Sequence, residues 1–479
     1  MGPADGQGTA LSAPGQAAAP AGEPPIPDES FASGARVLSV GIASTGIFTF
    51  AYLAGSSHLL GPSSYSRIAL CWAVMFVILS VIYRPIEQLL SRMIADRRAR
   101  GLHSHPLRIP AGIQAGFAAA FLIAALALRG QIQQGMFDGS SALYWILVIG
   151  VLAYAGSYFA RGWLAGHKRF ALYGGLVFLE STSRFLFPLA VAVGIGSGQD
   201  AIGLGMAVAP FASLSVMPFA LRRIRRAGSG PTGAGVPVAD AASEGPVHAQ
   251  VEEVSADLTL RHGAGFALAV VGIMFSEQML MNAGVLIVAA KAGGGTLTTG
   301  VVGFVFNVML IVRAPLQLFQ AIQTSILPHL TGLEVQESPA EFHRAVRITV
   351  MAIGGFALAV AIGLLAIGPQ VMTAVLGNKG YSYGRLGLAI VGVGMGLHLI
   401  SGTLNQAALA RNQATPASIA WLSSVALFSV FVATSHAHGS TLVGRVEIGY
   451  CGSAAVLTAL LWLLYRLGQT APARCAMRR

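Results

Sequence analysis

Stretches of mostly apolar residues, each about long enough to cross a bilayer, recur between short polar segments from Ala35 to Gly468. A membrane-spanning helix needs roughly 20 such residues, because the hydrocarbon core offers no other partner to backbone N–H and C=O groups. The pattern predicts an all-α polytopic membrane protein with about twelve transmembrane helices. The predicted spans are 35–56, 67–90, 109–128, 142–161, 172–194, 201–221, 264–290, 299–324, 348–376, 384–407, 416–434 and 442–466.

Long polar segments rich in Ala, Gly and Pro predict the domain organisation. Residues 1–34 predict a disordered cytoplasmic tail, and they lack the basic and apolar regions of a signal peptide. Residues 227–262 separate six spans from six, which predicts a cytoplasmic linker between two six-helix lobes around a central cavity. The predicted lobes are 35–226 (spans 1–6) and 263–467 (spans 7–12), followed by a second cytoplasmic tail at 468–479.

The charged residues predict how the chain lies in the membrane. Only 10% of the residues are charged, and the 30 Lys and Arg residues exceed the 19 Asp and Glu residues to give a net charge of +11. Most of the basic residues flank the spans on the side that holds the N-terminus, and cytoplasmic loops retain such residues. We therefore predict a multi-pass protein of the bacterial plasma (inner) membrane with both termini cytoplasmic. Membrane topology and contact with anionic bilayer lipids explain the net charge, so no nucleic-acid partner is expected.

A short polar string occurs in the second span of each predicted lobe. Arg84-Pro-Ile-Glu-Gln88 aligns with Arg313-Ala-Pro-Leu-Gln317, which Gln320 follows three residues later. At about 100° per residue, the polar side chains of each string share one helix face. Such a stripe is costly against lipid, so we expect Arg313, Gln317, Gln320, Arg84 and Gln88 to face a cavity and bind substrate. The alternative for Arg84, near the cytoplasmic helix end, is that its side chain reaches the lipid headgroups.

Three further ionisable residues lie within spans. Glu180 and Arg184 are spaced i,i+4, which predicts an ion pair along one helix face. A structural role and a role in ion coupling are the two interpretations of this pair. Glu277 has no cation within four residues on its own helix, and Arg313 in the next span is its expected partner. A structural ion pair, a site for coupling to H⁺ or Na⁺, and a position in the cavity wall are the three interpretations of Glu277.

Enzymatic and metal-binding patterns are scarce. The first outward loop, 55–65, has no acidic residue of the kind that a glycosyltransferase acting on a lipid-linked donor would present. His436 and His438 have ligand-like spacing, but no carboxylate or cysteine lies near them in the sequence. We therefore predict a protein that is not an enzyme and has no metal or other cofactor apart from a coupling ion.

Several strings together resemble a known family. Tyr158 to Phe170 (YFARGWLAGHKRF), followed by Glu180 and Arg184, is similar to the fourth-to-fifth-span region of bacterial polysaccharide exporters of the multidrug/oligosaccharidyl-lipid/polysaccharide (MOP) superfamily. Arg313 through Leu330 resembles their eighth-span signature, and Val375-Leu-Gly resembles the turn after their ninth span. The resemblance implies a flippase for undecaprenyl-(pyro)phosphate-linked saccharides, with a V-shaped cavity lined by the first, second, seventh and eighth spans.

The polar stripes suit that function independently. Arg84 and Arg313 can supply positive charge to a pyrophosphate, and the glutamines can hydrogen-bond to sugars. The lipid tail can stay in the bilayer while one lobe rocks against the other. The expected partners are the lipid-linked saccharide and bilayer lipids, with a polysaccharide polymerase or glycosyltransferases as further candidates.

Other functions are compatible with the sequence. A proton- or sodium-coupled small-molecule exporter of the MATE branch shares the architecture. Intramembrane carboxylates (Glu87, Glu180, Glu277 and Glu447) outnumber arginines (Arg84, Arg184 and Arg313), which favours that exporter. A major-facilitator transporter and a polytopic membrane glycosyltransferase are the remaining alternatives.

Overall fold

The computed structural model describes most of the chain, and its regular elements are all helical. The described residues are 29–99, 107–218, 246–292, 300–313, 315–316, 339–377, 380–411, 413–434 and 441–470. Ten helices in these ranges are long and apolar enough to cross a membrane. The two remaining predicted spans overlap α1 (Glu29–Leu59) and a shorter apolar helix, Val301–Arg313. The all-α polytopic fold predicted from hydropathy is confirmed.

The helices follow the predicted spans in order. The first group comprises α1 (Glu29–Leu59), α2 (Pro62–Ala99), α3 (Arg108–Ala127), the π-helical turn η1 (Gln131–Met136), α4 (Ser141–Gly166), α5 (Phe170–Ala192) and α6 (Gly198–Leu214). The second group comprises α8 (Pro246–Ala292), the helix Val301–Arg313, α10 (Pro339–Leu376), α11 (Arg385–Ala410), α12 (Ala414–Thr434) and α13 (Leu442–Thr470).

Several helices extend beyond the apolar residues that predicted them. α1 begins at Glu29, inside the predicted tail, α8 begins at Pro246, inside the predicted linker, and α4 continues to Gly166. A helix satisfies its backbone hydrogen bonds internally in water as well as in lipid, so the end of an apolar run does not mark the end of a helix. Residues 1–28, 219–245 and 471–479 lie outside the described residues.

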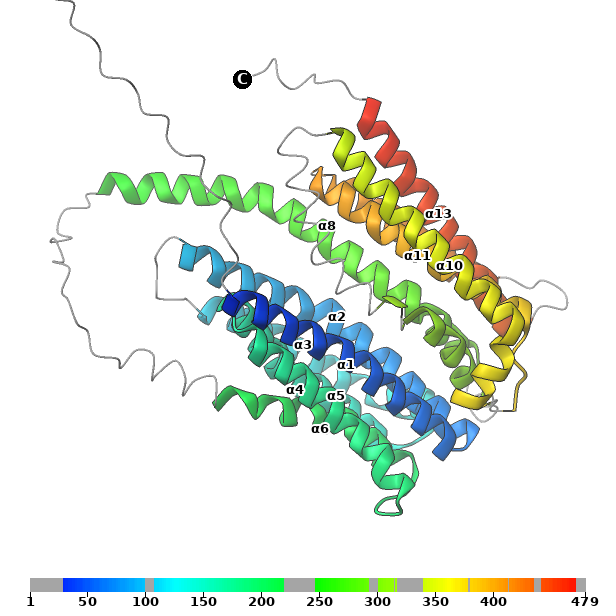
Figure 1. The fold of residues 1–479 in the computed structure, drawn as a ribbon. Coiled ribbons are helices and arrows are strands. Elements are labelled where there is room, and N and C mark those ends of the chain that lie inside the picture. Colours follow the sequence, from blue (N-terminus) through cyan, green and yellow to red (C-terminus); the bar gives the residue numbers. More distant parts are fainter. Residues whose placement is uncertain are drawn as a thin grey trace, which may run out of the picture.

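The helices pack into two groups (Figure 1). In the first group α1 packs on α5, α5 on α6, and α4 on both α6 and α2. In the second group α10 packs on α11, α11 on α13, and α12 on both α13 and α8. α2 contacts α8 and α1 contacts α10 across the boundary between the groups. In Figure 1 the groups lie close together at the end with the α1–α2 turn and diverge toward the end where α8 begins.

Hydrogen bonds join the two groups at the end that carries the α1–α2 turn. The Tyr65 hydroxyl of α2 donates to the Asn307 side-chain oxygen, and the Asn307 amide donates to the Tyr383 hydroxyl at 3.3 Å. The Gly303 N–H donates to Ser66 Oγ at 3.0 Å. A Cβ at Gly303 would lie 2.7 Å from the Tyr65 ring, so glycine permits this close approach.

The adjacent ends of α1 and α10 are bonded in the same way. The Ser57 hydroxyl donates to the Leu376 carbonyl oxygen, and His58 Nε2 lies 2.9 Å from the Val375 carbonyl oxygen. The contacts between the groups involve the end of α1, the start of α2, the first half of Val301–Arg313 and the end of α10. We call this set of bonds between Ser57, His58, Tyr65 and Ser66 on one side and the second group on the other the interlobe clasp.

Candidate functional site

A cavity of about 400 Å³ lies between the two helix groups. α1, α2, α4 and α5 line one side, and α8 with the helix Val301–Arg313 lines the other. The predicted contributors, the first, second, seventh and eighth spans, all take part, and the fourth and fifth spans contribute as well.

The repeated arginines meet in this cavity. Arg84 and Gln88 from α2 and Arg313 from Val301–Arg313 all line it. Two strings far apart in the sequence therefore line one cavity. No hydrogen bond or ion pair joins Arg84 to another residue in the described part of the chain. Gln317 and Gln320, the other two predicted binding residues, lie outside the described residues.

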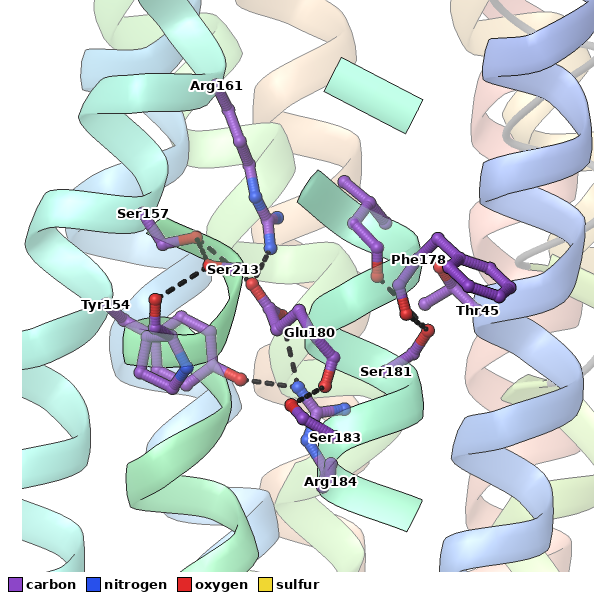
Figure 2. Close-up of polar contacts among 12 residues, drawn as sticks. Thr45, Tyr154, Ser157, Arg161, Phe178, Glu180, Ser181, Ser183, Arg184 and Ser213 are labelled. Carbon is purple, nitrogen blue, oxygen red and sulfur yellow. Dashed lines mark hydrogen bonds and ion pairs between the residues drawn. The ribbon is translucent and has the colours of Figure 1, made fainter. Parts of the chain in front are cut away.

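Glu180 is the centre of a buried ionic network (Figure 2). Its carboxylate accepts from Arg184 at 3.1 Å, which confirms the predicted i,i+4 pair. Its other oxygen accepts from Arg161 of α4 and from the Ser157 hydroxyl at 3.1 Å. Arg184 also donates to the Tyr154 hydroxyl. Because Glu180 and Arg184 are 6% and 2% exposed, each charge depends on the others for stabilisation.

A close approach of α2 and α4 brings a second carboxylate beside this network. A Cβ at Gly162 would lie 2.7 Å from the Glu87 carbonyl oxygen, so the missing side chain lets the two helices touch. The Glu87 carboxylate accepts a 2.7 Å hydrogen bond from the Tyr173 hydroxyl of α5 and lines the cavity. Both cavity-lining carboxylates are therefore hydrogen-bonded to the protein.

Arg313 is held by neutral groups. It donates to the Asn282 side-chain oxygen on α8 and, at 3.5 Å, to the Met281 carbonyl oxygen. Its guanidinium also lies over the Phe306 ring, 4.6 Å from the ring centre. The guanidinium therefore keeps its full positive charge in these contacts.

The expected ion pair between Arg313 and Glu277 is not formed. Glu277 is absent from the cavity lining, and no ion pair or hydrogen bond joins it to a described residue. Successive helical residues are turned by about 100°, so Gln278 and Asn282 share the cavity face of α8 whereas Glu277 lies beside it.

Two site residues were missed by the sequence interpretation. Arg161 lies where the apolar run of the predicted fourth span ends, although α4 continues for another turn. Asn282 was not singled out, although its i,i+4 spacing from Gln278 in the middle of a span was an available signal. An aromatic wall was missed too: Trp72 and Phe76 stack with ring centres 4.3 Å apart and line the cavity.

The charged lining suits an anionic ligand. Four arginines (Arg84, Arg161, Arg184 and Arg313) and two glutamates (Glu87 and Glu180) line the cavity. Hydroxyl groups of Thr45, Thr49 and Ser80 add hydrogen-bonding capacity. Within the described residues, no three His, Cys, Asp or Glu side chains come together as metal ligands.

Comparisons with known proteins identify the fold. No family model matches the chain, and no curated protein matches it. Solved structures, however, do match the chain. An inward-facing multidrug resistance MATE family transporter of the MOP superfamily matches with a TM-score of 0.58 at 15% identity, over 91% of this chain and 99% of that chain.

Two bent-form structures are also similar. The Vibrio cholerae MATE transporter VcmN matches with a TM-score of 0.55 at 15% identity, over 92% of this chain and 98% of its own. A MATE structure in the bent conformation matches with a TM-score of 0.54 at 16% identity, over 91% and 95% of the two chains. The chain therefore has the same two-lobed helical fold as these MATE transporters.

Proposed function

We propose that the chain is an alternating-access exporter that moves an undecaprenyl-(pyro)phosphate-linked saccharide across the bacterial inner membrane. The observation that carries this proposal is the pair Arg84 and Arg313. They come from opposite helix groups, line one cavity, and form no ion pair with a carboxylate among the described residues. Unneutralised guanidinium groups in a cavity within a membrane protein favour an anionic ligand.

The chemistry of such a cargo matches the lining. A pyrophosphate accepts paired hydrogen bonds from a guanidinium, which is planar and always charged. Gln88, Gln278 and the threonine hydroxyls offer donors and acceptors to sugar hydroxyls. A lipid tail needs no site of its own if the cavity opens sideways to the bilayer.

The interlobe clasp supports an inward-facing state. Under the predicted topology the clasp lies at the outer side, while Arg84 lies toward the cytoplasmic end of α2. Transport then requires the clasp to open while the opposite ends of the two helix groups close. The likeness to an inward-facing MATE structure supports this assignment.

A proton- or sodium-coupled small-molecule exporter is the second candidate. The fold comparisons favour it over the saccharide flippase, since the matched structures are MATE transporters. A cationic cargo needs a free carboxylate, however. Glu180 is paired with two arginines, so Glu87, which accepts from the neutral Tyr173 hydroxyl, is the one cavity-lining carboxylate without an ion pair among the described residues, against four arginines. The charges of the cavity therefore favour the anionic cargo.

The roles of the remaining predicted residues follow from their contacts. Glu180 and Arg184 act as a structural unit with Arg161, and Glu277 is a candidate coupling site because it lacks an ionic partner among the described residues. A polysaccharide polymerase or glycosyltransferases would supply or consume the cargo.

The test is flipping by purified protein in liposomes. A fluorescent undecaprenyl-pyrophosphate-linked disaccharide would be added, and its appearance in the outer leaflet would be measured by dithionite quenching. Arg313→Ala and Arg84→Ala should each lower the rate by roughly 10- to 100-fold, the range for losing one charge-assisted contact. Arg313→Lys should recover part of the rate, because a point charge replaces a bidentate group.

Arg385→Ala is the matched control. It removes an arginine that is exposed at the start of α11 and lies outside the cavity, so its rate should equal that of the wild type. Absence of lipid flipping by the wild type, together with efflux of a cationic dye driven by a proton or sodium gradient, would favour the second candidate.

A further inference from the structure

The arginines of the cavity are held in two different ways. Arg161 and Arg184 share the Glu180 carboxylate, so their charges are largely compensated by the protein. Arg313 is bonded by an amide oxygen and a backbone carbonyl oxygen and stacks on a ring. These groups position a guanidinium without neutralising it.

Asn282 is itself held in one orientation. Its side chain is 1% exposed, and its Nδ2 donates to the Gln278 carbonyl oxygen at 2.8 Å. Because the NH₂ group must face the Gln278 carbonyl oxygen to donate this bond, the Oδ1 atom of the same amide faces Arg313. The amide therefore acts as a fixed acceptor for the guanidinium.

The guanidinium keeps unused donors. Both hydrogen bonds from Arg313 to acceptors in the described residues use Nη2, and Nε is buried without an acceptor there. Arg313 therefore has both the charge and the N–H groups that a phosphate requires.

We infer that Asn282 determines the charge preference of the cavity by holding Arg313 in place while leaving its charge available to an anionic phosphate or pyrophosphate group. Asn282 is a positioning residue in this role, and the inference rests on the proposed function of the cavity as the transport site. A carboxylate is nearly identical in shape to the amide but would form an ion pair with Arg313. Replacing the NH₂ group of residue 282 by a carboxylate oxygen would therefore change a cavity that prefers anions into one that tolerates cations.

The experiment measures binding of two probes to the full chain in nanodiscs by isothermal titration calorimetry. Farnesyl pyrophosphate is the anionic probe, and tetraphenylphosphonium is the cationic probe. The wild type should prefer the pyrophosphate. Asn282→Asp should weaken pyrophosphate binding by roughly 10- to 100-fold, the range for losing one charge-assisted contact, and should strengthen tetraphenylphosphonium binding.

Two further variants test whether position 282 acts through Arg313. Gln278→Glu places a carboxylate on the same cavity face one turn away, at a side chain that does not hydrogen-bond to Arg313. It should reduce pyrophosphate affinity less than Asn282→Asp does. Asn282→Ala removes the acceptor but adds no charge. It should weaken pyrophosphate binding, and the cavity should still prefer the anionic probe over the cationic one. This variant also tests the role of Asn282 if Asn282→Asp does not fold.

The outcomes separate the two proposals. Wild-type pyrophosphate affinity in Asn282→Asp or in Asn282→Ala, or an equal loss in Gln278→Glu, would overturn the role of Asn282 and leave the proposed function standing. A wild type that binds tetraphenylphosphonium but not farnesyl pyrophosphate would instead contradict the proposed function.

Discussion

Glu180 and Asn282 show that the side chain bonded to an arginine determines whether the positive charge of that arginine is available to a ligand. Glu180 binds Arg161 and Arg184 in a buried cluster, where the mutual attraction of the charges offsets their loss of hydration. Asn282 binds Arg313 without compensating its charge. The first arrangement stabilises the first helix group, and the second leaves a cation for a ligand.

The stabilising role of Glu180 can be tested directly. Glu180→Gln removes the carboxylate and leaves two buried guanidinium groups unpaired, so the free energy of unfolding should fall by about 3–5 kcal/mol. Thermal unfolding of the detergent-solubilised protein, followed by size-exclusion chromatography with fluorescence detection, measures the change.

Glu447→Gln provides the control for that prediction. Glu447 is half-buried on α13 and forms no ion pair with a described residue, so loss of its carboxylate should change the unfolding temperature little. Glu180→Asp keeps the charge on a shorter side chain and should recover part of the stability. Equal unfolding temperatures for Glu180→Gln and the wild type would show that the network is not needed for folding.

At the scale of elements, α2 connects the interlobe clasp with the cavity. It carries Tyr65 and Ser66 of the interlobe clasp near its start and Arg84 and Gln88 of the cavity nearer its end. Pro85 lies inside this helix and removes one backbone hydrogen bond there. A movement of α2 that opens the clasp therefore also moves the cationic lining.

We predict that Tyr65→Phe loosens the clasp, because it removes the hydroxyl that donates to Asn307. Loss of one buried hydrogen bond costs about 0.5–1.5 kcal/mol, which should raise the fraction of molecules open at this end by roughly 2- to 10-fold. Distances between spin labels at Gly61→Cys and Gly384→Cys, measured by pulsed electron paramagnetic resonance without the native cysteines, would report the opening.

Both label sites are exposed, and a Cβ at either one meets no atom within 4 Å. Tyr144→Phe is a matched control, because it removes a buried tyrosine hydroxyl that bonds the Ala125 carbonyl oxygen within the first helix group. A distance distribution for Tyr65→Phe identical to that of the wild type would mean that the clasp does not hold the groups together.

The whole molecule has a cavity between its helix groups and a clasp at one end, and its function depends on which end faces the cytoplasm. The positive charges of the flanking segments predict that both termini and the segment between the lobes are cytoplasmic. This orientation places the clasp outside and the diverging helix ends inside.

Single cysteines at Ser229 and Ser243 test the orientation. In a chain without its native cysteines, an impermeant maleimide should label them in inside-out vesicles and leave them unlabelled in intact cells. A cysteine in place of Gly61, at the clasp end, should show the opposite pattern. Labelling of Ser229→Cys from outside intact cells would reverse the orientation and place the clasp in the cytoplasm.

The sequence by itself determined the order and approximate positions of the described helices, the all-α membrane fold, and the ion pair of Glu180 with Arg184. These depend on local properties, namely the apolar length that a bilayer requires and the 3.6-residue turn that sets side-chain spacing. It also indicated that Arg84 and Arg313 face a cavity, because polar stripes avoid lipid.

Only the tertiary structure decided the partners that come from different helices. Arg161 joins Glu180 because α4 continues past its apolar run and packs close to α2 and α5. Arg313 meets Asn282 instead of Glu277, because the rotation of α8 about its own axis is set by packing against α12 and α2. Hydropathy gives the length of each helix, whereas its rotation, and with it the charge of the cavity, follows from contacts between residues distant in the sequence.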